Sequence, residues 1–209
     1  SSDAVNMLQT GKAQEGITEL RSILPDLQQA VLSARQMVEF LAQFKVQSKA
    51  EDFDCIALLR ICLKQVARLH RQSPFSSELR AHASSVILKG YSSRLQMVFF
   101  NLILNAAQQM APRRRLTTLT VSTAEEESDG RRWLIIRFTD SGPGIHARHW
   151  RRILDLGFST RDGGSGLGLY ICKRQLREHQ GTIYVQESTM LVGTTFVVRL
   201  PLVMDRVES

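Results

Sequence analysis

Four glycines fall within the six residues from Gly163 to Gly168, and this loop leads directly into the apolar stretch Leu169-Tyr170-Ile171. Glycine has no Cβ, so the backbone there can take positive φ and come close to a ligand. A loop that opens a helix presents unpaired N–H groups and the positive end of the helix dipole, which suits phosphate oxygens. A flexible linker is the alternative, but linkers are rarely followed at once by an apolar helical stretch. The run therefore predicts a phosphate-binding loop.

The surroundings of this loop disfavour the two most common nucleotide-binding loops. A Rossmann fingerprint needs a strand just before the glycines and an acidic residue about 20 residues further on. Here the preceding stretch, Trp150 to Leu156, reads as helix and turn. A P-loop needs Gly-Lys-Ser or Gly-Lys-Thr, and neither tripeptide occurs in the sequence.

The composition is that of a globular protein. The 209 residues are 43% hydrophobic and 22% charged, which allows one large domain or a domain plus an appendage. No apolar run reaches the roughly 18 residues of a membrane span, and no signal peptide is visible at the start. The cysteines, Cys55, Cys62 and Cys172, lack metal-like spacing and are predicted to be buried free thiols in a reducing compartment. We expect a cytoplasmic location and leave membrane anchoring of the full-length protein open.

The net charge of +7 raises the question of nucleic-acid binding. The basic residues are scattered, however. Their longest run is Arg113 to Arg115, and no aromatic residues interleave with it. We therefore expect no nucleic-acid partner, because an anionic ligand or an acidic protein accounts for the same charge.

Residues 17 to 45 have the pattern of a long amphipathic helix. The apolar residues recur at alternating spacings of three and four, as in a coiled coil or helical bundle: Leu20, Leu24, Leu27, Val31, Ala34, Val38 and Leu41. Upstream, Ala4 to Leu8 reads as the end of an earlier helix, followed by a turn at Thr10 to Lys12. The segment predicts an antiparallel helical hairpin with a short first arm. A helix packed on its own domain is the alternative.

The rest of the chain mixes helices and strands without regular alternation, which indicates an α+β sandwich. A polar hinge is expected at Gln47 to Asp54, and a solvated acidic hairpin loop at Glu125 to Gly130. Helices are expected at Asp54 to Gln72 and at Ser93 to Met110. The expected strands are two short ones within Phe75 to Leu88, the second around Ser85 to Leu88, and then Leu116 to Thr123, Trp133 to Thr139, Thr182 to Glu187 and Thr194 to Pro201.

Two asparagines in the helix from Ser93 form a candidate ligand set. Asn101 and Asn105 lie one turn apart, so both amides point from the same helix face. An amide oxygen is a hard neutral ligand that suits Mg²⁺. Two buried amides that merely satisfy backbone groups are the alternative.

Two further motifs offer groups for a nucleotide. Asp140 opens the turn Asp-Ser-Gly-Pro-Gly after a predicted strand, where a carboxylate can accept a hydrogen bond from an exocyclic amine such as adenine N6. The glycines let a flat ring approach the backbone, although alone this is an ordinary turn. Phe158 and Arg161, in Phe-Ser-Thr-Arg just before the glycine loop, offer an aromatic anchor and a cation near the predicted phosphates.

Taken in order, Asn-x-x-x-Asn, Asp-x-Gly-x-Gly, Phe-Ser-Thr-Arg and Gly-x-Gly-Leu-Gly-Leu resemble the motifs of the Bergerat nucleotide-binding fold. This is the ATPase superfamily of gyrase, Hsp90, MutL and the histidine kinases. The likeness spans Arg94 to about Leu202, and the closing strands resemble those of histidine-kinase catalytic domains. It implies a two-layer α/β sandwich with a mixed sheet as an ATP-binding catalytic domain over residues 51–209. Part of a dimerisation hairpin would precede it over residues 1–50.

The resemblance implies a role for each matching residue. Asn105 would coordinate Mg²⁺, with Asn101 supporting the same site, and Asp140 would bind adenine. Residues 145–163 would form a mobile lid. The remaining implied contacts are the adenine-pocket glycines Gly142 and Gly144, the lid's hydrophobic latch Phe158, and the phosphate contacts Arg161, Gly164, Gly166, Leu167 and Gly168. The family often has a basic or aromatic pair after the second Asn, and Gln108-Gln109 stands there instead, which puts one phosphate contact in question.

Asn101 separates subclasses of this superfamily. Members that hydrolyse ATP, and the related serine kinases, usually carry Glu one turn before the Mg²⁺ asparagine as a general base. An amide cannot take a proton, whereas a histidine acceptor arrives as a neutral nucleophile and needs less help. The pattern implies a protein-histidine kinase. A serine kinase of the anti-sigma-factor type and a nucleotide-dependent pseudokinase are the alternatives.

The histidines lack the His-Glu or His-Asp context of a phosphoacceptor: His70, His82, His146, His149 and His179. The acceptor is therefore expected outside this chain, in a two-component phosphorelay. The expected partners are ATP, a response regulator and a second copy, joined as a homodimer through the N-terminal helices. No membrane contact is expected for this part.

Overall fold

The computed structural model describes residues 24, 49–69, 76–110, 117–160, 164 and 166–202. The chain divides into two compact units, Ser1–Gln43 with Ser159–Ser165 and Phe44–Phe158 with Gly166–Ser209. The fold below is that of the second unit. The helix predicted for residues 17–45 lies outside the described residues apart from Leu24, which is helical.

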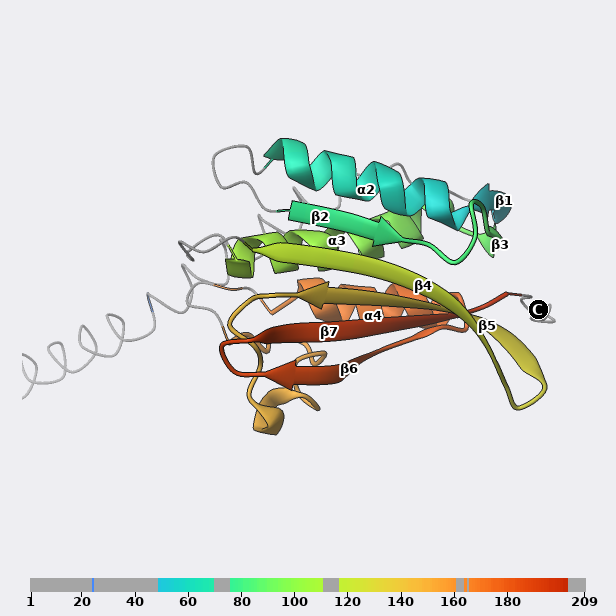
Figure 1. Ribbon diagram of the computed structural model, residues 1–209. Helices are drawn as coiled ribbons and strands as arrows, with labels where there is room; N and C mark the ends of the chain where they lie inside the picture. The colour runs from blue at the N-terminus through green and yellow to red at the C-terminus, as the bar shows by residue number, and fades with distance from the viewer. Residues whose placement is uncertain are drawn as a thin grey trace, which may run out of the picture. The chain divides into compact units, whose positions relative to one another are not determined.

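One mixed sheet forms a layer of the second unit, as the resemblance predicted. Its order is β2-β4-β5-β7-β6, with β2 parallel to β4 and every other pair antiparallel. Figure 1 shows the strands side by side. Their bounds are Ser76–Arg80 (β2), Thr118–Ser128 (β4), Arg131–Asp140 (β5), Thr182–Thr189 (β6) and Gly193–Pro201 (β7).

Three helices cover one face of this sheet. They are α2 (Cys55–Leu69), α3 (Ser92–Met110) and α4 (Gly168–Glu178). α3 lies between the other two and contacts β4 and β5 (Figure 1). A separate antiparallel pair, β1 (Glu51–Asp54) and β3 (Ile87–Gly90), flanks the helices, and a short 3₁₀ helix, η1, spans Ala147–His149. The helices predicted at 54–72 and 93–110 are confirmed within the described residues.

The core lies between the sheet and the helices. Leu134, Ile136 and Phe138 lie at every second position of β5, on one face of the sheet, and are buried, while Ile135 is buried on the opposite face. The Phe138 ring lies 6.1 Å, centroid to centroid, from that of Phe99 on α3, and both rings are buried. Each such ring contributes roughly 1.5–3 kcal/mol of burial free energy. On the other face, Arg137 reaches across β7 to Gln186 (3.1 Å).

The prediction of an acidic hairpin loop at 125–130 is wrong in its length, because the turn is shorter. β4 continues to Ser128, and the turn is only Asp129-Gly130, with φ of 56° and 70°. Positive φ at both central residues is the geometry that a two-residue Asp-Gly hairpin turn needs. Arginines of the neighbouring strand β5 reach two of the acidic side chains that the prediction had placed in a loop. Glu125 pairs with Arg132, and Arg137 donates to Glu126 at 3.0 Å.

The hinge predicted at 47–54 is also corrected, because its last four residues form β1. Phe53 pairs with Leu88 in β3, a partner that local sequence does not reveal. Asp54 then starts α2: its Oδ1 accepts the N–H groups of Ile56 (2.9 Å) and Val86 (3.2 Å). Desolvation works to raise the pKa of this carboxyl, but these hydrogen bonds outweigh it and hold the pKa below its usual value.

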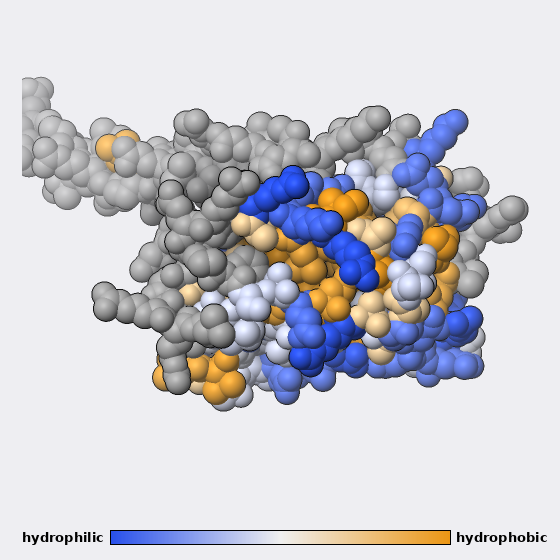
Figure 2. Space-filling view, turned by 45° about the horizontal axis from the view of Figure 1, so that its top comes forward, coloured by the Kyte–Doolittle hydropathy of each residue, from blue (hydrophilic) through white to orange (hydrophobic). Residues whose placement is uncertain are grey.

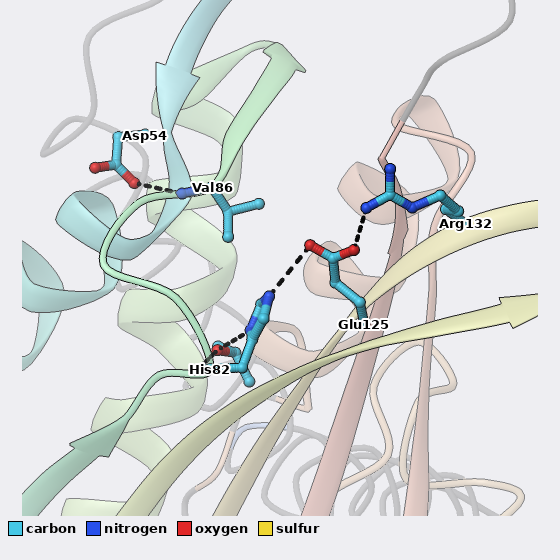
Figure 3. A network of polar contacts seen from close by, with 6 residues as sticks. Asp54, His82, Val86, Glu125 and Arg132 are labelled. Carbon is cyan, nitrogen blue, oxygen red and sulfur yellow. Dashed lines mark hydrogen bonds and ion pairs between the residues drawn. The ribbon is translucent and has the colours of Figure 1, made fainter.

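The loop after β2 is tied to β4, as Figure 3 shows. The N–H of His82 donates to Thr123 Oγ1 (3.1 Å), and its Nδ1 lies 2.8 Å from the same oxygen. The ring Nε2 lies 3.2 Å from Glu125 Oε1, which links the loop to the Glu125–Arg132 pair. This loop leads to Val86, which Asp54 holds at the other end.

The outer face of α2 is basic and partly apolar. Arg60, Lys64 and Arg68 follow one another at helical spacing and are exposed, and the helix contains no acidic residue. Ile61 and Leu69 are exposed beside them. With the top of Figure 1 turned forward, Figure 2 shows apolar surface bordered by polar side chains. Within the described part of the chain, no helix has the length and hydrophobicity to span a membrane.

Candidate functional site

The two asparagines of α3 have different surroundings although they share a face. Asn101 is 6% exposed, and its Nδ2 donates to Cys172 Sγ on α4 at 3.2 Å. Asn105 is half-buried, and its side chain makes no hydrogen bond or ion pair with any described residue. One turn of helix therefore separates an amide committed to packing from an amide that can bind a ligand.

The start of α4 lies directly on Asn101. A Cβ on Gly168 would lie 2.7 Å from Asn101 Oδ1, closer than real Cβ contacts come. Only glycine therefore lets the first turn of α4 approach α3 this closely. Leu167, at the N-cap, makes no side-chain cap hydrogen bond. The N–H groups of a helix start without such a cap suit an anionic ligand.

Gly166 makes a second close approach in the same loop. Its φ is +64°, and a Cβ there would lie 2.3 Å from the carbonyl carbon of Gly157 and 2.5 Å from Phe158 N. The glycine loop thus packs backbone against backbone on the end of the predicted lid. Both the positive φ and the lack of space require glycine at this position.

At the end of β5, the Asp140 turn faces the C-terminal end of α3. The N–H of Gly142 donates to Asp140 Oδ1 at 2.7 Å. A Cβ on Gly142 would overlap that oxygen at 2.6 Å and would lie 3.6 Å from Cβ of Gln109. Ser141 Oγ also donates to Met110 Sδ at 3.7 Å. α3 therefore lies beside the Asp140 turn at Gln109 and beside the start of α4 at Asn101, with Asn105 midway between these two residues along the helix.

The rest of this turn is fixed to the β6–β7 turn. Gly144 has φ +78°, and a Cβ there would lie 2.3 Å from the carbonyl oxygen of Thr189. The N–H of Ile145 donates to Ser188 Oγ (2.7 Å), and the N–H of Leu191 donates to the Pro143 carbonyl (2.7 Å). The two glycines singled out after Asp140 thus have no room for a side chain, Gly142 because of the Asp140 carboxylate and Gly144 because of the Thr189 backbone.

The predicted lid is compact up to Phe158. Trp150 Nε1 donates to the Ile145 carbonyl at 3.0 Å. The Phe158 ring lies 5.3 Å from the His149 ring, and the Arg152 guanidinium carbon lies 4.7 Å from its centroid. Desolvation, together with the charges of Arg148, His146 and Arg152, lowers the pKa of His149. Phe158 is therefore held by an imidazole and a cation.

Two predicted phosphate contacts do not enter this geometry. Arg161 lies outside the described residues, and Gly164 belongs to the other compact unit. The described residues also contain no group of three or more His, Cys, Asp or Glu side chains that could hold a metal ion.

Sequence reasoning missed two residues that hold α4 to α3 and to the residue just before it. Cys172 follows Gly168 by one helical turn, so spacing could have placed it on the same face of α4 as Gly168. His179 was considered only as a phosphoacceptor, but it is 2% exposed, and its Nε2 lies 3.0 Å from the backbone nitrogen of Tyr91. Its Nδ1 lies 2.8 Å from the Gln175 carbonyl. The three cysteines are buried and free, as predicted.

The comparisons with known proteins agree with this architecture. Residues 90–204 match the family model described as histidine kinase-, DNA gyrase B- and HSP90-like ATPase. Sporulation kinase C of Bacillus subtilis is 35% identical over 119 residues, which are 57% of this chain and 26% of that protein. The signal transduction histidine-protein kinase AtoS of Escherichia coli is 27% identical over 168 residues, covering 80% of this chain and 26% of AtoS.

Solved structures show the same fold. The mycobacterial sensor histidine kinase MprB superposes with a TM-score of 0.62 at 23% identity, covering 72% of this chain and 97% of that chain. Full-length ShkA in complex with AMPPNP gives a TM-score of 0.63 at 19% identity, covering 75% of this chain and 32% of that chain. The chain belongs to the histidine kinase-, DNA gyrase B- and HSP90-like ATPase family, and its relatives are sensor histidine kinases. The chain spans 26% of the length of each of the two curated relatives named above.

Proposed function

We propose that this chain is the ATP-binding catalytic region of a two-component sensor histidine kinase, which donates the γ-phosphoryl group of ATP to a histidine outside the chain. The observation that carries the proposal is the position of Asn105. Its half-buried amide makes no hydrogen bond with the described residues. It lies on α3 between Gln109, which lies beside the Asp140 turn, and Asn101, which contacts the start of α4.

Adenine would bind at the Asp140 turn. The carboxylate, one oxygen of which holds the Gly142 N–H, would accept a hydrogen bond from the N6 amine. Gly142 and Gly144 carry no side chain that could block a flat ring. Neighbouring atoms also leave no room for a side chain at either position. The phosphates would meet the N–H groups of Gly166, Leu167 and Gly168 at the start of α4. Gly164 and Arg161 would complete these contacts by resemblance alone.

The donor set fits Mg²⁺ better than a transition metal. Asn105 offers one neutral oxygen, and Mg²⁺ normally keeps several waters and takes further oxygens from phosphates. Bound there, the ion would neutralise charge that develops on the transferred phosphoryl group. Asn105 would hold the ion, and the first turn of α4 would orient the phosphates.

The site supplies no general base at the usual position. Asn101 occupies it, and its amide is buried and bonded to a thiol. This favours transfer to histidine over hydrolysis or serine phosphorylation, which need a base to activate water or a hydroxyl. By resemblance, residues 1–50 would be part of the dimerisation hairpin of a homodimer, residues 51–209 the catalytic domain, and a response regulator the receiver of the phosphoryl group.

The test is phosphotransfer from labelled ATP to a helical hairpin that carries a histidine in a His-Glu or His-Asp context. Acid-labile, base-stable label on the hairpin supports the proposal. Acid-stable label would instead indicate a serine kinase. Nucleotide binding without any transfer would indicate a pseudokinase that signals through its helices.

A further inference from the structure

We propose that Asn101 is a positioning residue, which sets the first turn of α4 through Cys172 and does not support the metal ion. This inference rests on the function proposed above. It replaces the role that the resemblance implied for Asn101, and it assigns a role to Cys172, which no motif includes.

The contact between the two side chains is buried on both sides. Asn101 is 6% exposed and Cys172 is 1% exposed. The amide Nδ2 donates to Sγ at 3.2 Å, and the thiol donates to the Val98 carbonyl at 3.8 Å. Burial raises the pKa of this thiol to about 12, so it remains a neutral S–H group that can make both contacts. The Cys172 thiol on α4 thus bridges two groups of α3, the Asn101 amide and the Val98 carbonyl.

The amide of Asn101 contacts α4 at two points one helical turn apart. One point is Gly168, which leaves no room for a Cβ beside Oδ1, and the other is Cys172. Two contacts at i and i+4 on one helix face restrain both sliding and rotation of that helix. The restrained turn is the one whose N–H groups would meet the phosphates.

Asn105, one turn further along α3, differs from Asn101 in both burial and hydrogen bonding. It is half-buried and forms no side-chain hydrogen bond with the described residues. For Asn101 to reach a metal ion, its amide would have to leave Cys172 and the first turn of α4. The pair therefore divides the work: Asn105 faces the ion, and Asn101 holds the helix that binds the phosphates.

A double-mutant cycle on the full chain tests the coupling. We expect Asn101→Ala and Cys172→Ala each to weaken Mg-ATP binding about tenfold, the loss of one buried hydrogen bond. The double variant should be no weaker than the worse single variant, because both changes remove the same contact. Cys172→Ser should recover most of the affinity, since a hydroxyl also accepts an N–H. Cys62→Ala removes an equally buried thiol on α2 and should leave the affinity unchanged.

Two further readouts separate positioning from metal binding and from general destabilisation. Asn105→Ala should raise the Mg²⁺ concentration needed for half-maximal ATP binding, and Asn101→Ala should not. Asn101→Ala should also weaken ATP binding much more than adenosine binding, because adenosine lacks the phosphates that α4 would hold. An unfolded or loosened variant would lose both ligands together.

Additive losses of Mg-ATP affinity in the double variant would overturn the inference. An altered Mg²⁺ requirement in Asn101→Ala would also overturn it, and so would a loss of adenosine affinity as large as the loss of ATP affinity. Each of these leaves the proposed function standing. If the unaltered chain binds no ATP at all, the proposed function fails and this inference fails with it.

Discussion

The imidazole of His179 ties the end of α4 to the start of α3: its Nε2 accepts the backbone N–H of Tyr91 at 3.0 Å. Because Nε2 accepts, the ring proton is on Nδ1, which donates to the Gln175 carbonyl at 2.8 Å. Gly90 allows this contact, since a Cβ there would lie 2.7 Å from the ring. The geometry requires a neutral imidazole, because protonation of Nε2 would break the bond to Tyr91.

This relationship predicts acid sensitivity of the fold. Desolvation, together with the nearby Arg94 guanidinium, holds the pKa of His179 below 6.5, its usual value. Below about pH 6.5, His179 therefore binds a proton in the unfolded chain but stays neutral in the folded chain until the pH reaches its lower folded pKa. The stabilisation is present above pH 6.5 and is lost as pH falls toward the folded pKa. Urea unfolding at pH 7.5 and pH 5.5 measures the difference.

The variant His179→Gln should reduce this pH dependence and lower the free energy of unfolding by roughly 1–3 kcal/mol, the cost of a disturbed buried hydrogen bond. His146→Gln, which changes an exposed histidine, is the matched control and should keep the pH dependence of the unaltered chain. The same pH dependence in His179→Gln would contradict the assignment.

Gly168→Ala should weaken ATP binding at least tenfold. In an ordinary helix the change from Gly to Ala stabilises by up to about 1 kcal/mol, but here the added Cβ meets Asn101 Oδ1 at 2.7 Å. The start of α4 must move away from α3, and its N–H groups move with it. Titration calorimetry with ATP measures the effect. Gly130→Asn, at an open turn with φ +70°, should bind ATP normally.

Asn105→Ala should lower Mg²⁺-dependent phosphotransfer by about 10²-fold, the usual effect of removing one preorganised electrostatic group. The fold should be retained, because the side chain makes no hydrogen bond with the described residues. Gln96→Ala on the same helix removes a contact to Gln65 (3.3 Å), the one side-chain hydrogen bond that Gln96 makes among the described residues, and this variant should transfer normally. Unchanged transfer in Asn105→Ala would refute its metal role.

Asp140→Asn should weaken ATP binding by roughly 10- to 100-fold, the range for a hydrogen bond to a charged group. The amide oxygen can still accept the Gly142 N–H, so the turn should keep its shape. The amide NH₂ would then face the adenine amine, a donor against a donor. Calorimetry that found equal affinity would remove Asp140 from the adenine site.

Much of this fold could be predicted because its signals are local. Asn101 and Asn105 lie one turn apart on a helix that runs from Ser92 to Met110, within one residue of the predicted bounds. The β4–β5 hairpin was predicted, but its acidic strand end was taken for a loop. That end is held by cross-strand arginines such as Arg137, which local propensity does not register. β1 was missed for the same reason, since its partner β3 is distant in the chain.

Local sequence patterns predict which residues would approach a nucleotide: the glycines that need positive φ or empty space, the carboxylate at a strand end, and the two amides on one helix face. Which of those amides is available to a ligand depends instead on how the helices pack in three dimensions. Cys172 lies 71 residues from Asn101, and the packing of α4 on α3 buries one asparagine and not the other. Helical periodicity is a local property of the chain, whereas burial depends on what the rest of the chain places against it.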